Sequence, residues 1–186
     1  MRRFPLAFLI LGVLSLLAAG AVALAVLESP TVTATAAVHQ GADETLGATR
    51  VAGEYTATYL PSEVISFVFS APDTATETAL TPKGTVKKRR SLVGTEATSF
   101  LQPVRVLSSL SDFVRQRDGS YVSTEPISHV LPKSKRAGIT GTYRTTVRVT
   151  GDYVVGVALY VQGIEKGQQF SETIDYKITA VGGWRS

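Results

Sequence analysis

The side chains that most often catalyse reactions or hold metal ions are few in this chain. It has two histidines, His39 and His129, and no cysteine. The histidines lie in unrelated segments, and no spacing of His, Cys or carboxylate residues resembles a zinc site. Asp43 and Glu44 are adjacent, so in a strand they would point to opposite faces, and in a loop they are ordinary solvated acids. We therefore expect no metal site and no catalytic pair here.

Motifs for nucleophiles and phosphate groups are missing from the sequence as well. It contains no Gly-x-Ser-x-Gly turn, and no spaced acidic loop fits calcium. The stretch Gly138-Ile139-Thr140-Gly141 is too short for a phosphate loop and precedes a strand instead of following one. The sequence thus predicts a protein that is not an enzyme and has no cofactor.

Basic residues form two runs that could contact an acidic partner. The first run contains Lys87, Lys88, Arg89 and Arg90, and the second contains Lys133, Lys135 and Arg136. Either the first run is a surface for an anionic lipid or polymer, or it is a loop whose charges are simply solvated; the pattern favours the loop. The net charge of +4 is mild, and nucleic acid is not expected as a partner of an exported domain.

Tyrosines offer the one aromatic pattern that could bind carbohydrate. Tyr55 and Tyr59 are four residues apart in one expected strand, where they would share a face. Tyr143 and Tyr160 would oppose each other in an expected hairpin. Aromatic pairs of this kind more often pack a sheet than bind sugar, so packing is the favoured interpretation.

The segment that decides where these residues lie is the start of the chain. Arg2 and Arg3 precede an uncharged, mainly apolar run over residues 4–27, which predicts a helix about 36 Å long, enough to cross a ~30 Å hydrocarbon core. With the positive end inside, the remaining residues are expected outside the cytoplasm, at the cell surface or in a periplasm-like space. The span is represented by Phe4, Leu9, Leu16, Leu24 and Leu27.

Two fates of this leader remain open. An uncleaved anchor is favoured because the apolar run is longer than the ~7–15 residues of a signal-peptide core. A cleaved signal peptide, which would release the protein, is the alternative, since Ala21-Val22-Ala23 and Ala23-Leu24-Ala25 both fit a cleavage site. A lipoprotein is not expected, because no cysteine is present to carry the lipid.

The rest of the chain is expected to form one β domain. Residues 28–45 are interpreted as a stalk in which residues 31–38 form a short strand, and residues 46–186 as an antiparallel β-sandwich of immunoglobulin-like or Greek-key type. Residues 48–60 and 64–69 predict strands, with Gly53 at a bulge. The apolar spacing of Leu107, Leu110, Phe113 and Val114 predicts one short helix over residues 106–117.

The C-terminal third has the clearest strand pattern. Gly151-Asp152 predicts a two-residue turn that joins residues 142–150 to residues 153–162. Its register would pair Val147 with Gly156 and Arg148 with Val155. In the last strand one face carries a single charge, Glu172, among the side chains of Phe170, Ile174, Tyr176, Ile178 and Ala180.

One apolar stripe would remain exposed in a sandwich. It consists of Val155, Val157, Leu159 and Val161, and each such side chain favours burial by ~1.5–3 kcal/mol. The favoured cover is the chain's own helix near residues 107–114. The alternatives are a second protein, or residues 31–38 donated as a strand by another copy.

Three functions follow from these features. The first is a structural or interaction protein of the cell envelope, held in the bilayer by residues 4–27 and assembling with itself or with other surface proteins, as a filament or pilus-type subunit does. The second is a single-span accessory subunit of a larger membrane complex. The third is a module that binds surface polysaccharide or anionic lipid through the basic runs.

Overall fold

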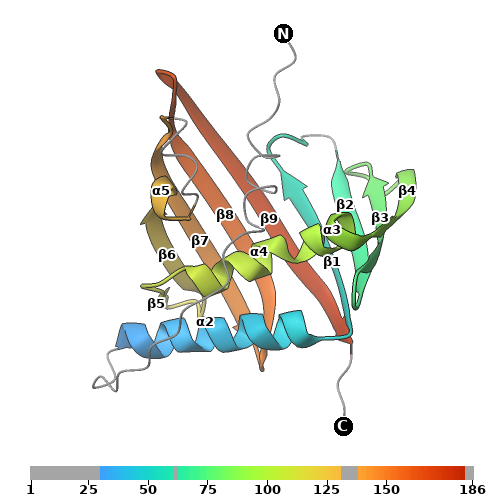
Figure 1. The fold of residues 1–186 in the computed structure, drawn as a ribbon, viewed down its shortest axis with the longest axis horizontal. Coiled ribbons are helices and arrows are strands. Elements are labelled where there is room, and N and C mark those ends of the chain that lie inside the picture. Colours follow the sequence, from blue (N-terminus) through green and yellow to red (C-terminus); the bar gives the residue numbers. More distant parts are fainter. Residues whose placement is uncertain (1–29, 61–62, 131–137, 183–186) are drawn as a thin grey trace.

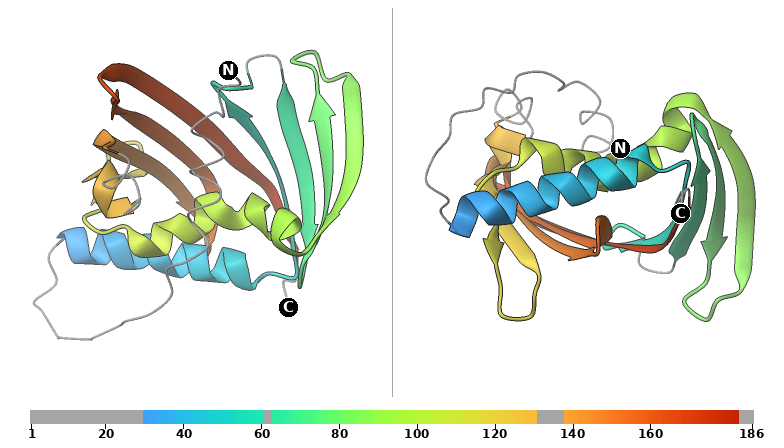
Figure 2. Two further views of the ribbon diagram at one scale, coloured as in Figure 1. Left: turned by 45° about the horizontal axis from the view of Figure 1, so that its top comes forward. Right: turned by 90° about the horizontal axis from the view of Figure 1, so that it is seen from below.

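The described part of the chain forms a single antiparallel sheet with helices on one face. This computed structural model describes residues 30–60, 63–130 and 138–182. The sheet curves into a U, and the helices lie within the U (Figure 2, right). Its nine described strands have the order β4-β3-β2-β1-β9-β8-β7-β6-β5. Their bounds are β1 (Arg50–Ala57), β2 (Val64–Ser70), β3 (Thr74–Leu80), β4 (Val86–Val93), β5 (Val114–Arg115), β6 (Tyr121–Pro126), β7 (Thr140–Thr150), β8 (Tyr153–Glu165) and β9 (Gln168–Gly182).

The helical layer consists of one long helix and one irregular run. The long helix is α2 (Pro30–Gly47), and it lies beside the run near one end of the strands (Figure 1). A further short helix, α5 (Ile127–Val130), follows β6. The irregular run comprises α3 (Gly94–Thr98), η2 (Ser99–Leu101), α4 (Gln102–Arg105) and η3 (Val106–Ser109).

The mainly antiparallel β fold is confirmed, but the predicted sandwich is wrong. Strands β1 to β4 form one meander and β5 to β9 a second, and β9 pairs with β1 so that both belong to one sheet. Helices, not a second sheet, cover the apolar inner face. Strand patterns along a sequence show that one face of each strand needs cover, but they do not specify what covers it.

The strand predicted over residues 31–38 is wrong, because these residues begin α2. Its Thr-rich composition favours strands locally, yet Ala34, Val38 and Ala42 repeat every four residues and are all buried. Small side chains let this helix lie close to the sheet: a Cβ on Gly41 would be 3.1 Å from a methyl of Val149. The segment is therefore a packed helix of the domain and not a free strand for donation to another copy.

The helix predicted over residues 106–117 is confirmed only in part. The helical run ends at Ser109, and Leu110 is already extended, with φ −93° and ψ 144°. Asp112 has φ 56°, a left-handed conformation that a helix cannot include. Leu110 and Phe113 are nevertheless buried, so the apolar spacing identified core residues although the backbone between them is not helical.

The hairpin at Gly151-Asp152 is present, but its register changes after two pairs. Thr150 pairs with Tyr153 and Val149 with Val154, as the turn requires, and then Arg148 pairs with Gly156. Val155 is the extra residue of this bulge, so every later pair is displaced by one. A similar displacement occurs opposite the Ala52–Gly53 step of β1, but the extra residue belongs to β9, so the bulge predicted at Gly53 lies in the neighbouring strand.

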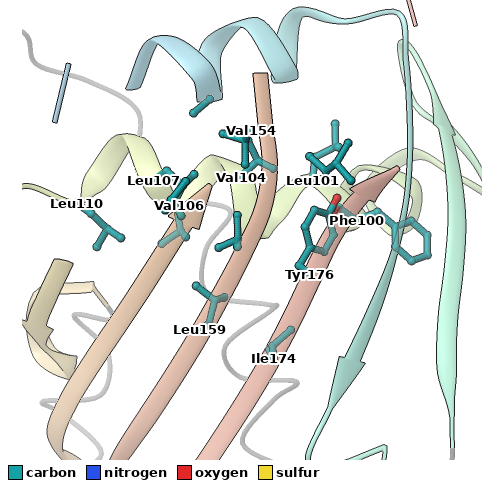
Figure 3. Packing of buried hydrophobic residues seen from close by; sticks show 14 of the residues in the cluster. Phe100, Leu101, Val104, Val106, Leu107, Leu110, Val154, Leu159, Ile174 and Tyr176 are labelled. Atoms are coloured by element: carbon teal, nitrogen blue, oxygen red, sulfur yellow. The ribbon is translucent and has the colours of Figure 1, made fainter. Parts of the chain in front are cut away.

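The predicted apolar stripe does not form a free surface. Val157, Leu159 and Val161 are 1%, 3% and 4% exposed. Helix α4 and helix α2 both contact β8 from this side, and Figure 3 shows Val104 and Leu107 of the irregular run facing Leu159. The chain's own helices therefore provide the cover. Val155, displaced by the bulge, belongs to the opposite face and is half-buried.

Few hydrogen bonds connect the helical layer to the sheet. The Thr45 hydroxyl, fully buried, donates to Gly41 O at 2.7 Å and accepts the Val154 N–H at 3.0 Å. The Tyr176 hydroxyl donates to Phe100 O at 2.7 Å. Most of the contact between the layers is thus apolar.

The predicted membrane span lies outside the described residues. Within the part of the chain that is described, no helix has the length and apolar character needed to cross a membrane.

Candidate functional site

A row of side chains crosses the inner face of the sheet on the side that α5 flanks. Backbone pairing places Glu125 of β6 opposite Tyr143 of β7, Tyr143 opposite Val161 of β8, and Val161 opposite Glu172 of β9. Glu125, Tyr143 and Val161 are at most 5% exposed, and Glu172 is half-buried. We call these four residues the inner row. It places two acids and one phenol within an otherwise apolar surface that continues through Leu159.

Two buried polar atoms of the inner row have neither a hydrogen bond nor an ion pair among the described residues. They are the Tyr143 hydroxyl and one carboxylate oxygen of Glu172, Oε2. Burial raises the pKa of the Tyr143 phenol and that of the Glu172 carboxyl. Buried polar atoms are nearly always hydrogen-bonded in folded proteins, since an unpaired one costs ~1–3 kcal/mol. Two such atoms on one row indicate a place where a ligand's polar group can bind.

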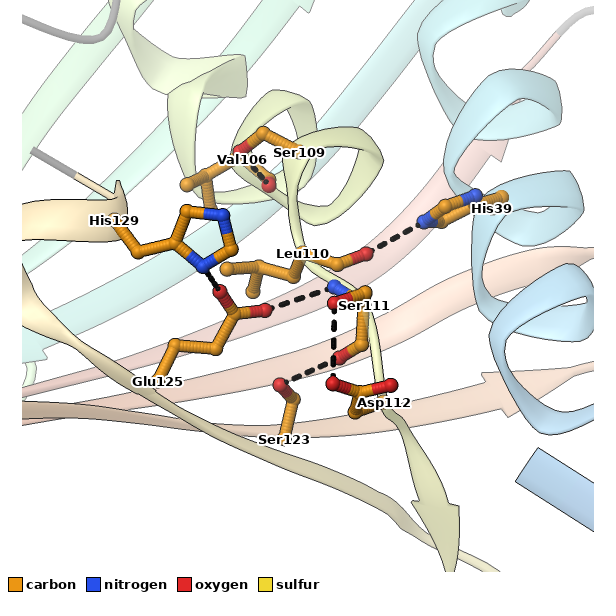
Figure 4. A network of polar contacts seen from close by, with 9 residues as sticks. All are labelled: His39, Val106, Ser109, Leu110, Ser111, Asp112, Ser123, Glu125 and His129. Atoms are coloured by element: carbon orange, nitrogen blue, oxygen red, sulfur yellow. Dashed lines mark hydrogen bonds and ion pairs between the residues drawn. The ribbon is translucent and has the colours of Figure 1, made fainter. Parts of the chain in front are cut away.

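The third polar member of the inner row has a structural partner. Glu125 accepts the Ser111 N–H through Oε1 at 2.8 Å, and its Oε2 contacts Nδ1 of His129 (Figure 4). His39 Nε2 donates to Leu110 O at 2.9 Å. The two histidines, which are far apart in sequence, therefore both contribute to holding the turn around Leu110 and Ser111. His39 binds it directly, and His129 does so through Glu125.

This network stabilises the fold locally. It holds the turn between η3 and β5 from both sides (Figure 4). No group of three His, Cys, Asp or Glu side chains in the described ranges could hold a metal ion.

The first basic run is a strand and not the predicted loop. It forms half of β4, an edge strand of the sheet, where charged side chains discourage pairing with another chain. Arg90 makes a bidentate ion pair with Glu77 at 2.9–3.0 Å, and this hydrogen bond raises the pKa of the guanidinium. Lys87 pairs with Glu63 at 3.3 Å.

The structure does not gather the four cations on one surface. Along β4, Lys88 and Arg90 pair with β3 residues 79 and 77, whereas Arg89 pairs with residue 78 and points to the other face. The second run, with Lys133, Lys135 and Arg136, lies outside the described residues.

The predicted cross-strand pair of Tyr143 and Tyr160 is wrong. The bulge at Val155 pairs Tyr143 with Val161 and Arg144 with Tyr160. The two tyrosines therefore lie on opposite faces of the sheet: Tyr143 is 1% exposed and Tyr160 is 39% exposed. Tyr55 is in β1, with its ring 6.5 Å from that of Phe100, and Tyr59 follows the strand.

The sequence contained a signal for the inner row. Glu172 is the only charge on its face of the last strand, and a lone acid among inward-facing apolar residues is unusual unless it is paired or functional. The alternation of Tyr143 and Val147 with Arg144 and Arg148 indicated the face of Tyr143 as well, but its pairing with Val161 depends on the bulge in β8.

Replacing Glu172 with glutamine should stabilise the protein at neutral pH. The pKa of this carboxyl is raised from the ordinary value of 4.5, so the folded chain holds the proton more tightly than the unfolded chain. The contribution of this carboxyl to stability is therefore fully present below pH 4.5 and is lost as the pH rises through the raised pKa. We expect Glu172→Gln to increase the unfolding free energy by about 1 kcal/mol at pH 7 and to change it little at pH 4.

Urea denaturation at both pH values measures this difference. The matched control is Glu165→Gln, in the same hairpin, for which we expect the same small effect at both pH values. An effect of Glu172→Gln that does not depend on pH would show that the carboxyl titrates normally.

No family model and no curated protein matches this chain. Among solved structures, the crystal structure of LprF from Mycobacterium bovis matches with a TM-score of 0.51 and 14% sequence identity, over 86% of this chain and 97% of LprF. At this level of identity the likeness concerns the fold, and this chain is similar in fold to LprF.

Proposed function

We propose that this protein is a non-catalytic lipid-binding protein of the cell envelope, with the lipid held between the inner face of the sheet and the helical layer. The observation that carries the proposal is the fully buried Tyr143 hydroxyl, which lacks a hydrogen-bond partner in the described structure. Binding sites for small amphipathic molecules are mostly apolar with a few placed polar groups, and the inner row has this composition.

The arrangement of layers supports an acyl chain as the apolar part of the ligand. Sheet and helices meet through aliphatic side chains such as Val104, Leu107 and Leu159, with few hydrogen bonds between the layers. An acyl chain admitted between the layers would contact the same kind of apolar side chain that the layers now present to each other. The apolar run over residues 4–27 supports an envelope location.

Tyr143 and Glu172 would bind the oxygen atoms of the lipid's ester or head group. The Tyr143 phenol can donate to such an oxygen. Burial raises the pKa of the Glu172 carboxyl, so an acceptor oxygen beside it meets a group that is protonated more easily than a solvated glutamate.

A labelled phospholipid tests the proposal. We expect the full chain to bind phosphatidylglycerol carrying an NBD group on one acyl chain, and lipids to be extracted from the purified protein and detected by mass spectrometry. Tyr143→Phe should weaken NBD-lipid binding about fivefold, the effect of one hydrogen bond, without loss of stability, because no protein hydrogen bond is removed.

The matched control is Tyr121→Phe, which alters a half-buried tyrosine outside the inner row and should leave binding unchanged. Absence of binding by the unaltered chain, or equal affinities of the Tyr143→Phe variant and the unaltered chain, would overturn the proposal.

The other two envelope functions have less support. Assembly through a donated strand depended on residues 31–38 being extended, and they are helical. An accessory subunit of a membrane complex remains a prediction that rests on the leader alone.

A further inference from the structure

A groove lies on the face of the sheet opposite the helices. It has a volume of about 580 Å³ and is formed by β7, β8 and β9. We call it the outer groove. It lies toward the end of the strands where the β8–β9 hairpin projects away from α2 and α4 (Figure 1). The side chains that the argument uses are Thr140, Thr142, Tyr160, Gln162, Gln169 and Ser171.

The strand register places these side chains in two rows on the outer face. Thr142, Gln162 and Ser171 form one row, and Thr140, Ile164 and Gln169 form the next. Strands are ~4.8 Å apart and successive rows on one face ~7 Å apart, so hydroxyl and amide groups are spread over an area about the size of a disaccharide. The inner row points to the other face, so the outer groove is separate from the proposed lipid site.

No residue that lines the outer groove carries a charge. A neighbouring groove of about 710 Å³ on the same face differs in this respect, since Glu54, Arg148, Asp175 and Lys177 line it. A charged ligand in the outer groove would lose hydration and gain no opposite charge. Hydroxyl and amide side chains both donate and accept hydrogen bonds, as sugar hydroxyls do.

An exposed aromatic ring completes the surface. Tyr160 is 39% exposed, and its hydroxyl donates to Gln162 Oε1 at 3.0 Å. This hydrogen bond fixes the phenol, so the ring offers an apolar face at little entropic cost. Ile164, 45% exposed, extends the apolar area. An apolar ring beside neutral hydrogen-bonding groups suits a pyranose, which has apolar faces and a polar edge.

We propose that the outer groove binds a neutral oligosaccharide, with Tyr160 stacking against a sugar ring and Gln162, Gln169 and the neighbouring hydroxyls binding its edge. This function is independent of the lipid site. It differs from charge-driven polysaccharide binding through the basic runs, because binding in the outer groove should not depend on salt.

The proposal is tested by titrating the full chain with neutral and charged oligosaccharides. The probes are maltohexaose, cellohexaose and mannohexaose, with hexagalacturonate as the charged comparison, each at low and high salt. We expect at least one neutral hexasaccharide to bind independently of salt and more tightly than hexagalacturonate. Tyr160→Ala should weaken it about tenfold or more, and Gln169→Ala should also weaken it.

The matched control is Tyr153→Ala, at the other end of β8, which should leave sugar binding unchanged. Tyr143→Phe should do the same, because it faces the lipid site. No binding by any neutral probe, equal binding by the Tyr160→Ala variant, or salt-sensitive binding of hexagalacturonate in preference to the neutral probes would overturn the proposal.

Discussion

Replacing Gly141 with alanine is expected to destabilise the protein by about 3 kcal/mol or more, because the new methyl group has no room. Gly141 has φ +149°, and a Cβ at this position would lie 2.1 Å from the carbonyl oxygen of Gln162 on β8. That oxygen belongs to the backbone and cannot move without separating β7 from β8. Opposite it, Gly163 is equally restricted, since its Cβ would lie 2.2 Å from Thr140 O.

The same hairpin provides a matched control for this prediction. At Gly156 the nearest atom to a new Cβ is Tyr176 O at 3.7 Å, an ordinary contact. Gly156→Ala should therefore change the unfolding free energy by less than about 1 kcal/mol. Urea denaturation of both variants measures the difference, and equal stability of the two would show that β7 and β8 are not as close as described.

The second large effect is expected from Phe67→Ala, with a loss of about 3–5 kcal/mol. Phe67 is 1% exposed, and its ring stacks on Phe100 at 4.9 Å and on Tyr176 at 5.3 Å. It also covers Gly53 on β1: a Cβ there would be 2.7 Å from the ring. Removing the ring leaves a cavity where β2, β9 and the helical run meet, and it exposes the Gly53 backbone.

Phe170→Ala is the comparison for Phe67→Ala, since Phe170 is a half-buried phenylalanine of β9 far from this cluster. Its expected cost is about half as large, because less apolar area leaves water when it packs. Denaturation midpoints and slopes for both variants give the two losses in unfolding free energy to be compared. A cost at Phe67 no greater than at Phe170 would mean that the stacked rings contribute nothing beyond ordinary burial.

The bulge at Val155 illustrates why the candidate site was hidden in the sequence. Alternation in residues 153–162 is apolar on both faces, so the sequence gives no preference between two registers. One extra residue in β8 places Val161 opposite Tyr143 on the inner face and leaves Tyr160 exposed in the outer groove. The composition of both proposed sites therefore depends on this displacement, which the packing of β8 against α4 and α2 favours.

Local patterns by themselves determined the strands β1, β2 and β7 to β9, the turn at Gly151-Asp152 and the lone acid Glu172, because alternation and turn chemistry act between near neighbours. Tertiary packing alone decided that residues 30–47 are a helix, that one curved sheet replaces a sandwich, and that Tyr160 faces outward. The reason is that burial against a distant surface outweighs the weak conformational preferences of a short segment. The sequence of that segment does not specify which surface it will pack against.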